Sequence, residues 1–144
     1  MIRIALHRSV PVLTGLLALL LVACTAAPSV TPLPSGQQPP ADCARVEGGV
    51  IDLSAQDLKF SAPCLVANAG EAFTISFTND DTQPHNVAIY PDSSKATQIM
   101  TGDIISTQGQ SLEYAVEAQD AGQYYFDCSV HPEMNGTLYV VDAG

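Results

Sequence analysis

The residues best suited to chemistry lie in one short segment near the end of the chain, Cys128-Ser-Val-His131-Pro-Glu-Met134. A thiolate, an imidazole and a thioether within seven residues form a compact set of donors that favours copper. We expect a loop here, because a continuous strand alternates its side chains between two faces and cannot bring three of them to one point. His85, which follows Pro84, could supply a second imidazole from a neighbouring strand.

Two histidines, one cysteine and a weakly bound methionine make the trigonal site of a blue-copper electron carrier. Each side chain also has an ordinary structural interpretation. Cys128 could be a buried thiol or half of a disulfide, His85 a hydrogen-bonded edge histidine, and Met134 a residue that fills a gap in the core. The combination favours one bound copper ion. Met100 stands apart and is interpreted as a core residue or as packing near the site.

The segments that must position these residues have the alternating side-chain pattern of β-strands. Apolar and polar side chains alternate along residues 73–78, 112–117, 123–128 and 138–140. Turn signals separate these runs, and they include Asn79-Asp-Asp81, Gly109, Asp120-Ala-Gly122 and Asn135-Gly136. There is no helical stripe of any length and no internal repeat. Seven or eight short strands in about 100 residues predict an all-β fold, an antiparallel Greek-key β-sandwich.

The start of the chain predicts export. A basic stretch precedes an apolar run, Val10 to Val22, that is too short to span a bilayer comfortably. Leu21-Val-Ala-Cys24 follows and resembles the bacterial lipobox, in which the cysteine is lipidated and becomes the first residue. This resemblance implies a signal peptide of residues 1–23 and a lipid anchor on Cys24. The alternative is an ordinary signal peptide with a chance cysteine near its end.

Residues 24–42 comprise Cys24 and a segment, residues 25–42, that has the composition of a linker, with five prolines and few large apolar side chains. Eighteen residues at ~3 Å each reach at most about 55 Å, so we expect a tether that leads to a folded domain of residues 43–144. The protein is then extracytoplasmic, in the periplasm or at the cell surface, and the lipid is its only attachment to the membrane.

The charge balance indicates which partners are possible. Beyond residue 23, three basic side chains remain against fifteen acidic ones, a formal net charge of −12. Such a surface repels phosphate backbones, which excludes nucleic acid as a partner. It should instead attract a basic redox protein, such as a c-type cytochrome, into brief and salt-sensitive encounters. The length fits a single domain, and we expect a monomer.

Residues 50–144 resemble a cupredoxin, the family of type 1 blue-copper proteins. Pro84-His85-Asn86 is similar to the first-ligand motif of the family, and the segments Gly122–Cys128 and Met134–Val140 are similar to its last two strands. The spacing C-x-x-H-P-x-M is similar to the short ligand loop of amicyanin.

This resemblance implies a role for each site residue. The copper ligands would be His85, Cys128 and His131, with Met134 as the long axial ligand. The backbone N–H of Asn86 would tune the cysteine sulfur, and its side chain would brace the ligand loop.

The number of cysteines bears on this assignment. If Cys24 is lipidated, one of the three remaining cysteines has no partner within the chain. A disulfide between Cys43 and Cys64 is reasonable in an oxidising compartment and leaves Cys128 for metal. The competing pairing joins Cys64 to Cys128.

Copper enclosed by protein offers no open position to a substrate, so we predict an electron carrier that cycles between Cu(I) and Cu(II), not an enzyme. In the family the electron typically leaves through the exposed loop histidine, here His131. Val130, Pro132 and Pro84 could form the apolar patch around it. One alternative is a copper-binding or copper-delivery lipoprotein, although the chain has no Met- or His-rich tract. Another is a metal-free module for adhesion or assembly, which would most simply lack ligands.

Overall fold

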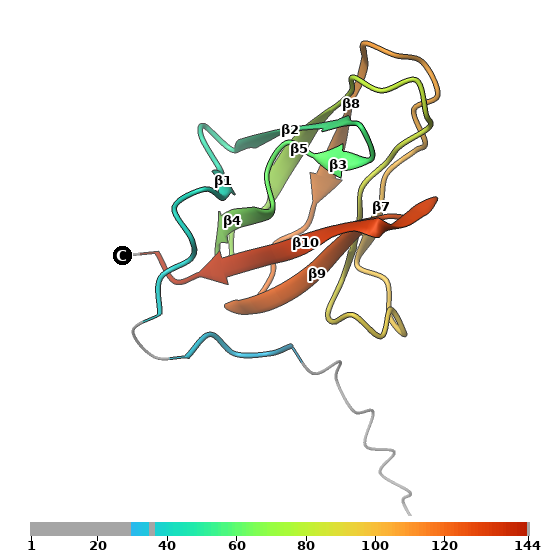
Figure 1. Ribbon diagram of the computed structural model, residues 1–144. Helices are drawn as coiled ribbons and strands as arrows, with labels where there is room; N and C mark the ends of the chain where they lie inside the picture. Colours follow the sequence, from blue (N-terminus) through green and yellow to red (C-terminus); the bar gives the residue numbers. More distant parts are fainter. Residues whose placement is uncertain (1–29, 35–36, 144) are drawn as a thin grey trace, which may run out of the picture.

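The computed structural model describes residues 30–34 and 37–143. Within these ranges ten β-strands form two facing sheets and no helix is present, which confirms the predicted all-β fold (Figure 1). The six-stranded sheet has the order β1-β4-β10-β9-β6-β7, and the four-stranded sheet has the order β3-β2-β5-β8. The strands are β1 (Ala44–Arg45), β2 (Val50–Gln56), β3 (Lys59–Phe60), β4 (Cys64–Asn68), β5 (Phe73–Asn79), β6 (Ala88–Tyr90), β7 (Met100–Thr101), β8 (Gln110–Val116), β9 (Gly122–Cys128) and β10 (His131–Val141).

The predicted signal peptide and Cys24 lie outside the described residues. None of the residues that the structure does describe belongs to a helix long and apolar enough to cross a bilayer.

Both sheets are mixed, where the sequence predicted antiparallel pairing. The pairs β1–β4, β4–β10 and β2–β5 are parallel. The strand count exceeds the predicted seven or eight because β1, β3 and β7 have only two residues each. A two-residue strand has no period to detect, and alternation along one strand does not record the direction of its partner.

The core lies between the two sheets, as the alternation requires. In β5 the side chains of Phe73, Ile75 and Phe77 are buried, while the residues between them are partly exposed or polar. Aromatic rings fill much of the space, and Phe77 stacks on Tyr114 with ring centroids 5.8 Å apart. The Tyr114 hydroxyl donates to the Asp103 carbonyl at 2.6 Å, and burial raises the pKa of this tyrosine to about 12.

The prediction of a turn at Asn135-Gly136 was wrong. Both residues lie within β10, opposite Asp127 and Phe126 of β9. A Cβ atom at position 136 would collide with the Phe126 ring and the Pro63 carbonyl, so the glycine serves close approach and not chain reversal.

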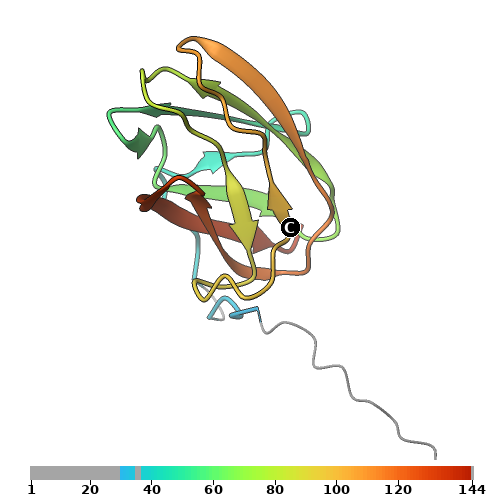
Figure 2. The same cartoon turned by 90° about the vertical axis from the view of Figure 1, so that its right-hand side faces the viewer.

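Strand direction gives the molecule two distinct ends, and Figure 2 shows the layers after a 90° turn. β2, β5 and β9 run toward the histidine end, which comprises the β2–β3 turn and residues 80–87, 102–109 and 128–134. β4, β8 and β10 run toward the far end, which comprises residues 46–49, 69–72, 117–121 and 142–143.

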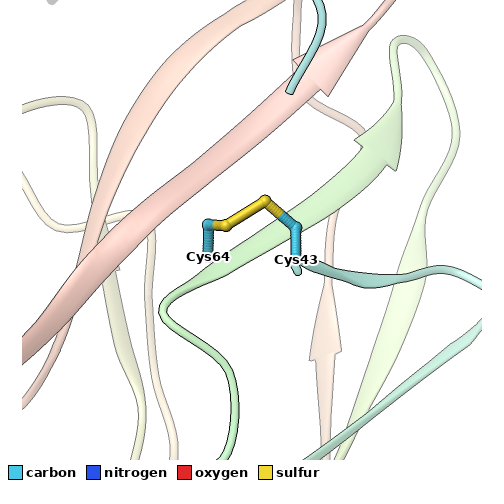
Figure 3. The surroundings of a disulfide bond; sticks show 2 residues. All are labelled: Cys43 and Cys64. Carbon is cyan, nitrogen blue, oxygen red and sulfur yellow. A yellow bond between two sulfur atoms is a disulfide. The ribbon is translucent and has the colours of Figure 1, made fainter. Parts of the chain in front are cut away.

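The disulfide joins Cys43 to Cys64 and leaves Cys128 free and buried (Figure 3). This is the pairing that the sequence favoured over Cys64 with Cys128. It fastens the chain just before β1 to the first residue of β4, within a small apolar cluster that includes Val66. The disulfide therefore holds the first residues of the domain against the six-stranded sheet.

Candidate metal centre

His85 lies between β5 and β6, fully buried. Its backbone exchanges two hydrogen bonds with Ile105, at 3.0 and 2.8 Å, which fix the ring at the histidine end. Nε2 lies 3.2 Å from Oδ2 of Asp81. If Nε2–H donates to this carboxylate, Nδ1 keeps its lone pair free for a metal ion.

Asp81 is itself held by backbone donors. Its carboxylate accepts hydrogen bonds from the N–H groups of Leu58, Thr82 and Gln83, at 3.1, 2.6 and 3.2 Å. These bonds, of which the Leu58 bond has the largest effect, hold the pKa of Asp81 well below its usual range, and the bond with His85 adds to them. The β2–β3 turn thereby helps to orient an imidazole that lies far away in the sequence.

Cys128 ends β9, and its sulfur is fully buried between the two histidines. Sγ lies 3.7 Å from Nδ1 of His85 and 3.7 Å from Nδ1 of His131. The chain turns at Ser129 and Val130 and then enters β10 at His131, which pairs with Cys128. The expected loop is therefore a two-residue turn followed by an irregular strand, whose register shifts between His131 and Asn135.

The three side chains leave room for one metal ion. Their ligand atoms all lie within 4.8 Å of one another, and the two imidazole rings are 4.8 Å apart at their centroids. A point equidistant from three such atoms is roughly 2.1–2.4 Å from each, close to ordinary metal–nitrogen and metal–sulfur bond lengths. Met134 is 2% exposed and belongs to the same core cluster as Cys128.

Asn86 ties the ligand turn to the opposite loop. Its Oδ1 accepts from the N–H of Ser129 at 2.9 Å and from the Ser129 hydroxyl at 3.0 Å. Its Nδ2 donates to the Gly102 carbonyl at 2.9 Å. The side chain is buried and makes all of these bonds inside the protein, so it restrains the residue that directly follows Cys128.

Sequence reasoning did not identify Asp81 as part of this site. The segment Asn79-Asp-Asp81 was interpreted only as a turn, although an acidic residue four positions before a candidate ligand histidine was a usable signal. A second cluster that could hold a metal, Asp42 with Cys43 and Cys64, is not a comparable candidate because the disulfide consumes both thiols.

The histidine end also carries an apolar surface. Over the described part of the chain, the exposed large hydrophobic side chains are Leu58, Ile104 and Val130, at 49%, 50% and 40% exposure. Leu58 donates its N–H to Asp81, Ile104 precedes the backbone partner of His85, and Val130 directly precedes His131. We call these three side chains the apolar rim. His131 is partly exposed beside it.

A buried cysteine sulfur between two imidazoles, on a two-sheet β-sandwich, is the arrangement of a blue-copper protein. The family model described as a cupredoxin-like domain matches residues 15–140. The chain therefore belongs to the cupredoxin family, and the cofactor of its site is one copper ion.

Individual relatives agree with this family. Amicyanin from Paracoccus versutus is 27% identical over 128 residues, which cover 86% of this chain and 89% of amicyanin. Reduced auracyanin from Roseiflexus castenholzii superposes with a TM-score of 0.55 at 19% identity, over 67% of this chain and 98% of that one. Auracyanin A from Chloroflexus aurantiacus, described as a "blue" copper protein, has a TM-score of 0.53 at 23% identity, with the same coverage. At these identities the two auracyanins show that the fold is shared.

Proposed function

We propose that this protein is a mononuclear blue-copper electron carrier in which His85, Cys128 and His131 hold the copper ion and Met134 is the weak axial ligand. The observation that carries the proposal is the position of the Cys128 sulfur, 3.7 Å from Nδ1 of each histidine. When bound, copper supplies a one-electron couple between Cu(I) and Cu(II).

The protein's own contribution is to hold these side chains still and keep water out. His85 and Cys128 are fully buried, so solvent does not reach their ligand atoms. Asp81 orients His85, and Asn86 restrains the turn after Cys128. A donor set held in this way rearranges little when one electron is gained or lost, and it leaves no open position for a substrate.

Electrons would enter and leave at the histidine end, through the partly exposed ring of His131. The apolar rim at the same end of the molecule can exclude water from a brief contact with a partner. Beyond the rim the surface is predominantly acidic, which favours a basic redox protein such as a c-type cytochrome. The contact would be weak and fast, as a carrier that must dissociate after each transfer requires.

We further propose that the carrier is extracytoplasmic and anchored to a bacterial membrane through lipidated Cys24. The lipobox-like segment Leu21-Val-Ala-Cys24 supports the anchor. The disulfide supports an oxidising compartment, since such bonds persist outside the cytoplasm. Residues 1–23 would be the signal peptide, residues 24–42 the linker, and residues 43–144 the copper domain.

The deciding experiment adds one equivalent of Cu(II) to the chain from Thr25 onward and records its visible spectrum and cyclic voltammogram. We expect an intense thiolate-to-copper band and a reversible one-electron wave. The band should disappear in Cys128→Ser, with circular dichroism used to show that this variant is folded.

Two results would contradict the proposal in different ways. Tight copper binding with a blue band but without a reversible wave would favour the copper-delivery alternative. A folded protein that gives no band would show that the ligands do not converge on copper.

A further inference from the structure

Part of the predicted linker is bound to the domain. The N–H of Gln123 donates to the Thr31 carbonyl at 2.8 Å, and Thr31 forms an antiparallel bridge with this residue (Figure 1, blue segment). The neighbouring strand β6 pairs only with Tyr125, Phe126 and Asp127, so it leaves the first half of β9 open on that side. Thr31 occupies the open edge.

Val30, next to this bridge, packs closely against the domain. It packs against the core cluster and lines a small cavity with Ile99 and Tyr124. Any Cβ atom at position 122 would collide with Val30 Cγ1 and press on the Thr31 carbonyl. The glycine at the start of β9 therefore lets the linker reach the sheet backbone.

The docked segment lies at the opposite end of β9 from the metal ligands. Gln123 precedes Cys128 by five residues of extended strand, which corresponds to about 17 Å. Only residues 25–29 separate Cys24 from the docked Val30, and the six steps from Cα to Cα reach at most roughly 20 Å. An undocked linker of eighteen residues would reach about 55 Å and would let the domain turn freely.

We infer that residues 30–34 are a docking segment that shortens the tether of the anchored protein from about 55 Å to roughly 20 Å, so that the electron-transfer partner is a protein that comes close to the lipid surface. The inference rests on the proposed anchoring at Cys24. With the linker docked, Val30 stays within roughly 20 Å of the lipid surface, whereas release of residues 30–42 lets the domain move up to about 55 Å away from it.

The first experiment measures docking alone, in the full chain. Amide hydrogen exchange of the peptide that contains Gln123 should accelerate at least ~10-fold in Val30→Asp, since a charge cannot occupy the apolar seat. Gly122→Ala should have the same effect from the domain side. Gln38→Asp is the matched control, because it adds the same charge to an exposed linker position and should leave exchange unchanged. Equal exchange in Val30→Asp and Gln38→Asp would overturn the docking.

The second experiment measures the distance of the domain from the lipid, with the processed lipoprotein in phosphatidylcholine vesicles. A dye on Gln108→Cys reports the histidine end and one on Ala72→Cys reports the far end, since both positions are exposed. With copper reduced, energy transfer to an acceptor in the membrane should weaken at both positions when Val30→Asp is added. Adding the control Gln38→Asp should leave it unchanged.

The outcomes separate the inference from the proposed function. Equal transfer in the wild type and in Val30→Asp would overturn the shortened tether, although the blue-copper site would stand. A processed chain that does not stay with the vesicles would refute the anchoring and the shortened tether together, and the exchange experiment would then judge the docking by itself.

Discussion

At the scale of single residues, the site depends on side chains that touch no metal. Asp81 contacts Nε2 of His85 at 3.2 Å and is fixed by three backbone N–H groups, so it can hold both the tautomer and the angle of the ring. Its neighbour Asp80 carries the same charge but is exposed, and its side chain has no hydrogen bond in the structure. A comparison of substitutions at Asp81 and Asp80 therefore separates the effect of the contact with His85 from the effect of the negative charge.

Asp81→Asn should raise the reduction potential of the loaded protein. The substitution removes a negative charge that favours the more positive oxidised state, an effect on the order of 1 kcal/mol or about 40 mV for one electron. It should also broaden or shift the His85 ring signals in NMR spectra of the reduced protein. Asp80→Asn should change the potential by less than a third as much and leave those signals in place. Equal effects of the two variants would mean that the contact with His85 is unimportant.

Met134 and Met100 form a second matched pair. Met134→Leu keeps the side-chain volume and removes the thioether, so the fold should lose less than about 1.5 kcal/mol of stability. Because a weak donor to Cu(II) is lost, we expect the potential to rise by roughly 50–100 mV while the blue band remains. Met100→Leu, at a partly buried position, should leave voltammogram and spectrum unchanged. A similar shift in both variants would argue against Met134 as the axial ligand.

At the scale of elements, the segment between β6 and β7 covers the outer side of β9. Lys95 reaches from it to Asp127, with Nζ 2.8 Å from Oδ2, and lies 5.8 Å from the centroid of the Tyr90 ring. Asp127 is fully buried one residue before Cys128, and its other oxygen has no partner within the described structure. The lysine is thus the main compensation for a buried charge next to the proposed metal ligand Cys128.

Lys95→Met should therefore destabilise the fold at pH 7 several times more than a substitution at an unpaired lysine, because it leaves the buried Asp127 carboxylate without its partner. Lys59→Met, at an exposed position with no ion pair, should cost less than about 0.5 kcal/mol. Urea unfolding of both variants measures the difference.

The pH dependence of this pair has a definite sign. The hydrogen bond with Asp127 raises the pKa of Lys95, so the folded state holds this proton more tightly than the unfolded chain does. The contribution is fully present below the ordinary lysine pKa of 10.5 and is lost as pH rises through the higher folded value. The difference in free energy of unfolding between the wild type and Lys95→Met should therefore become smaller as the pH rises above the folded-state pKa of Lys95. A difference that stays constant up to pH 12 would mean that the lysine stabilises the fold by packing alone.

At the scale of the whole molecule, charge and shape act on different steps of electron transfer. The formal net charge of −12 beyond residue 23 acts over the whole approach of a partner, whereas the apolar rim acts only in the final contact. The rate of encounter with a partner should therefore depend on the salt concentration, whereas the geometry of the bound complex should not.

The rate of reduction by a basic cytochrome c should fall roughly 10-fold between 10 and 300 mM NaCl, because salt screens the attraction. With the anionic reagent hexacyanoferrate the same protein should show the opposite trend, since repulsion is screened instead. Stopped-flow absorbance in the blue band measures both series. Rates that do not depend on salt with either reagent would refute steering by the net charge.

Features that depend on one segment alone could be predicted from the amino-acid sequence. Donor types and spacing in Cys128-Ser-Val-His131-Pro-Glu-Met134 indicated copper, because metal preference follows from ligand chemistry. The alternation along residues 73–78 and 123–128 predicted β5 and β9, because a strand with one buried face has a period of two.

Features that depend on contacts between distant segments could be read only from the folded chain. His85 and Cys128 lie 43 residues apart in the sequence and are in contact in the structure. Asp81 accepts a hydrogen bond from the N–H of Leu58. Gln123 donates to Thr31, which belongs to a segment whose composition predicted a free tether. Parallel pairing and the place of Gly136 inside β10 are of the same kind. A period or a motif records what one segment prefers, whereas these contacts depend on which segments the folded chain brings together and on the space left between them.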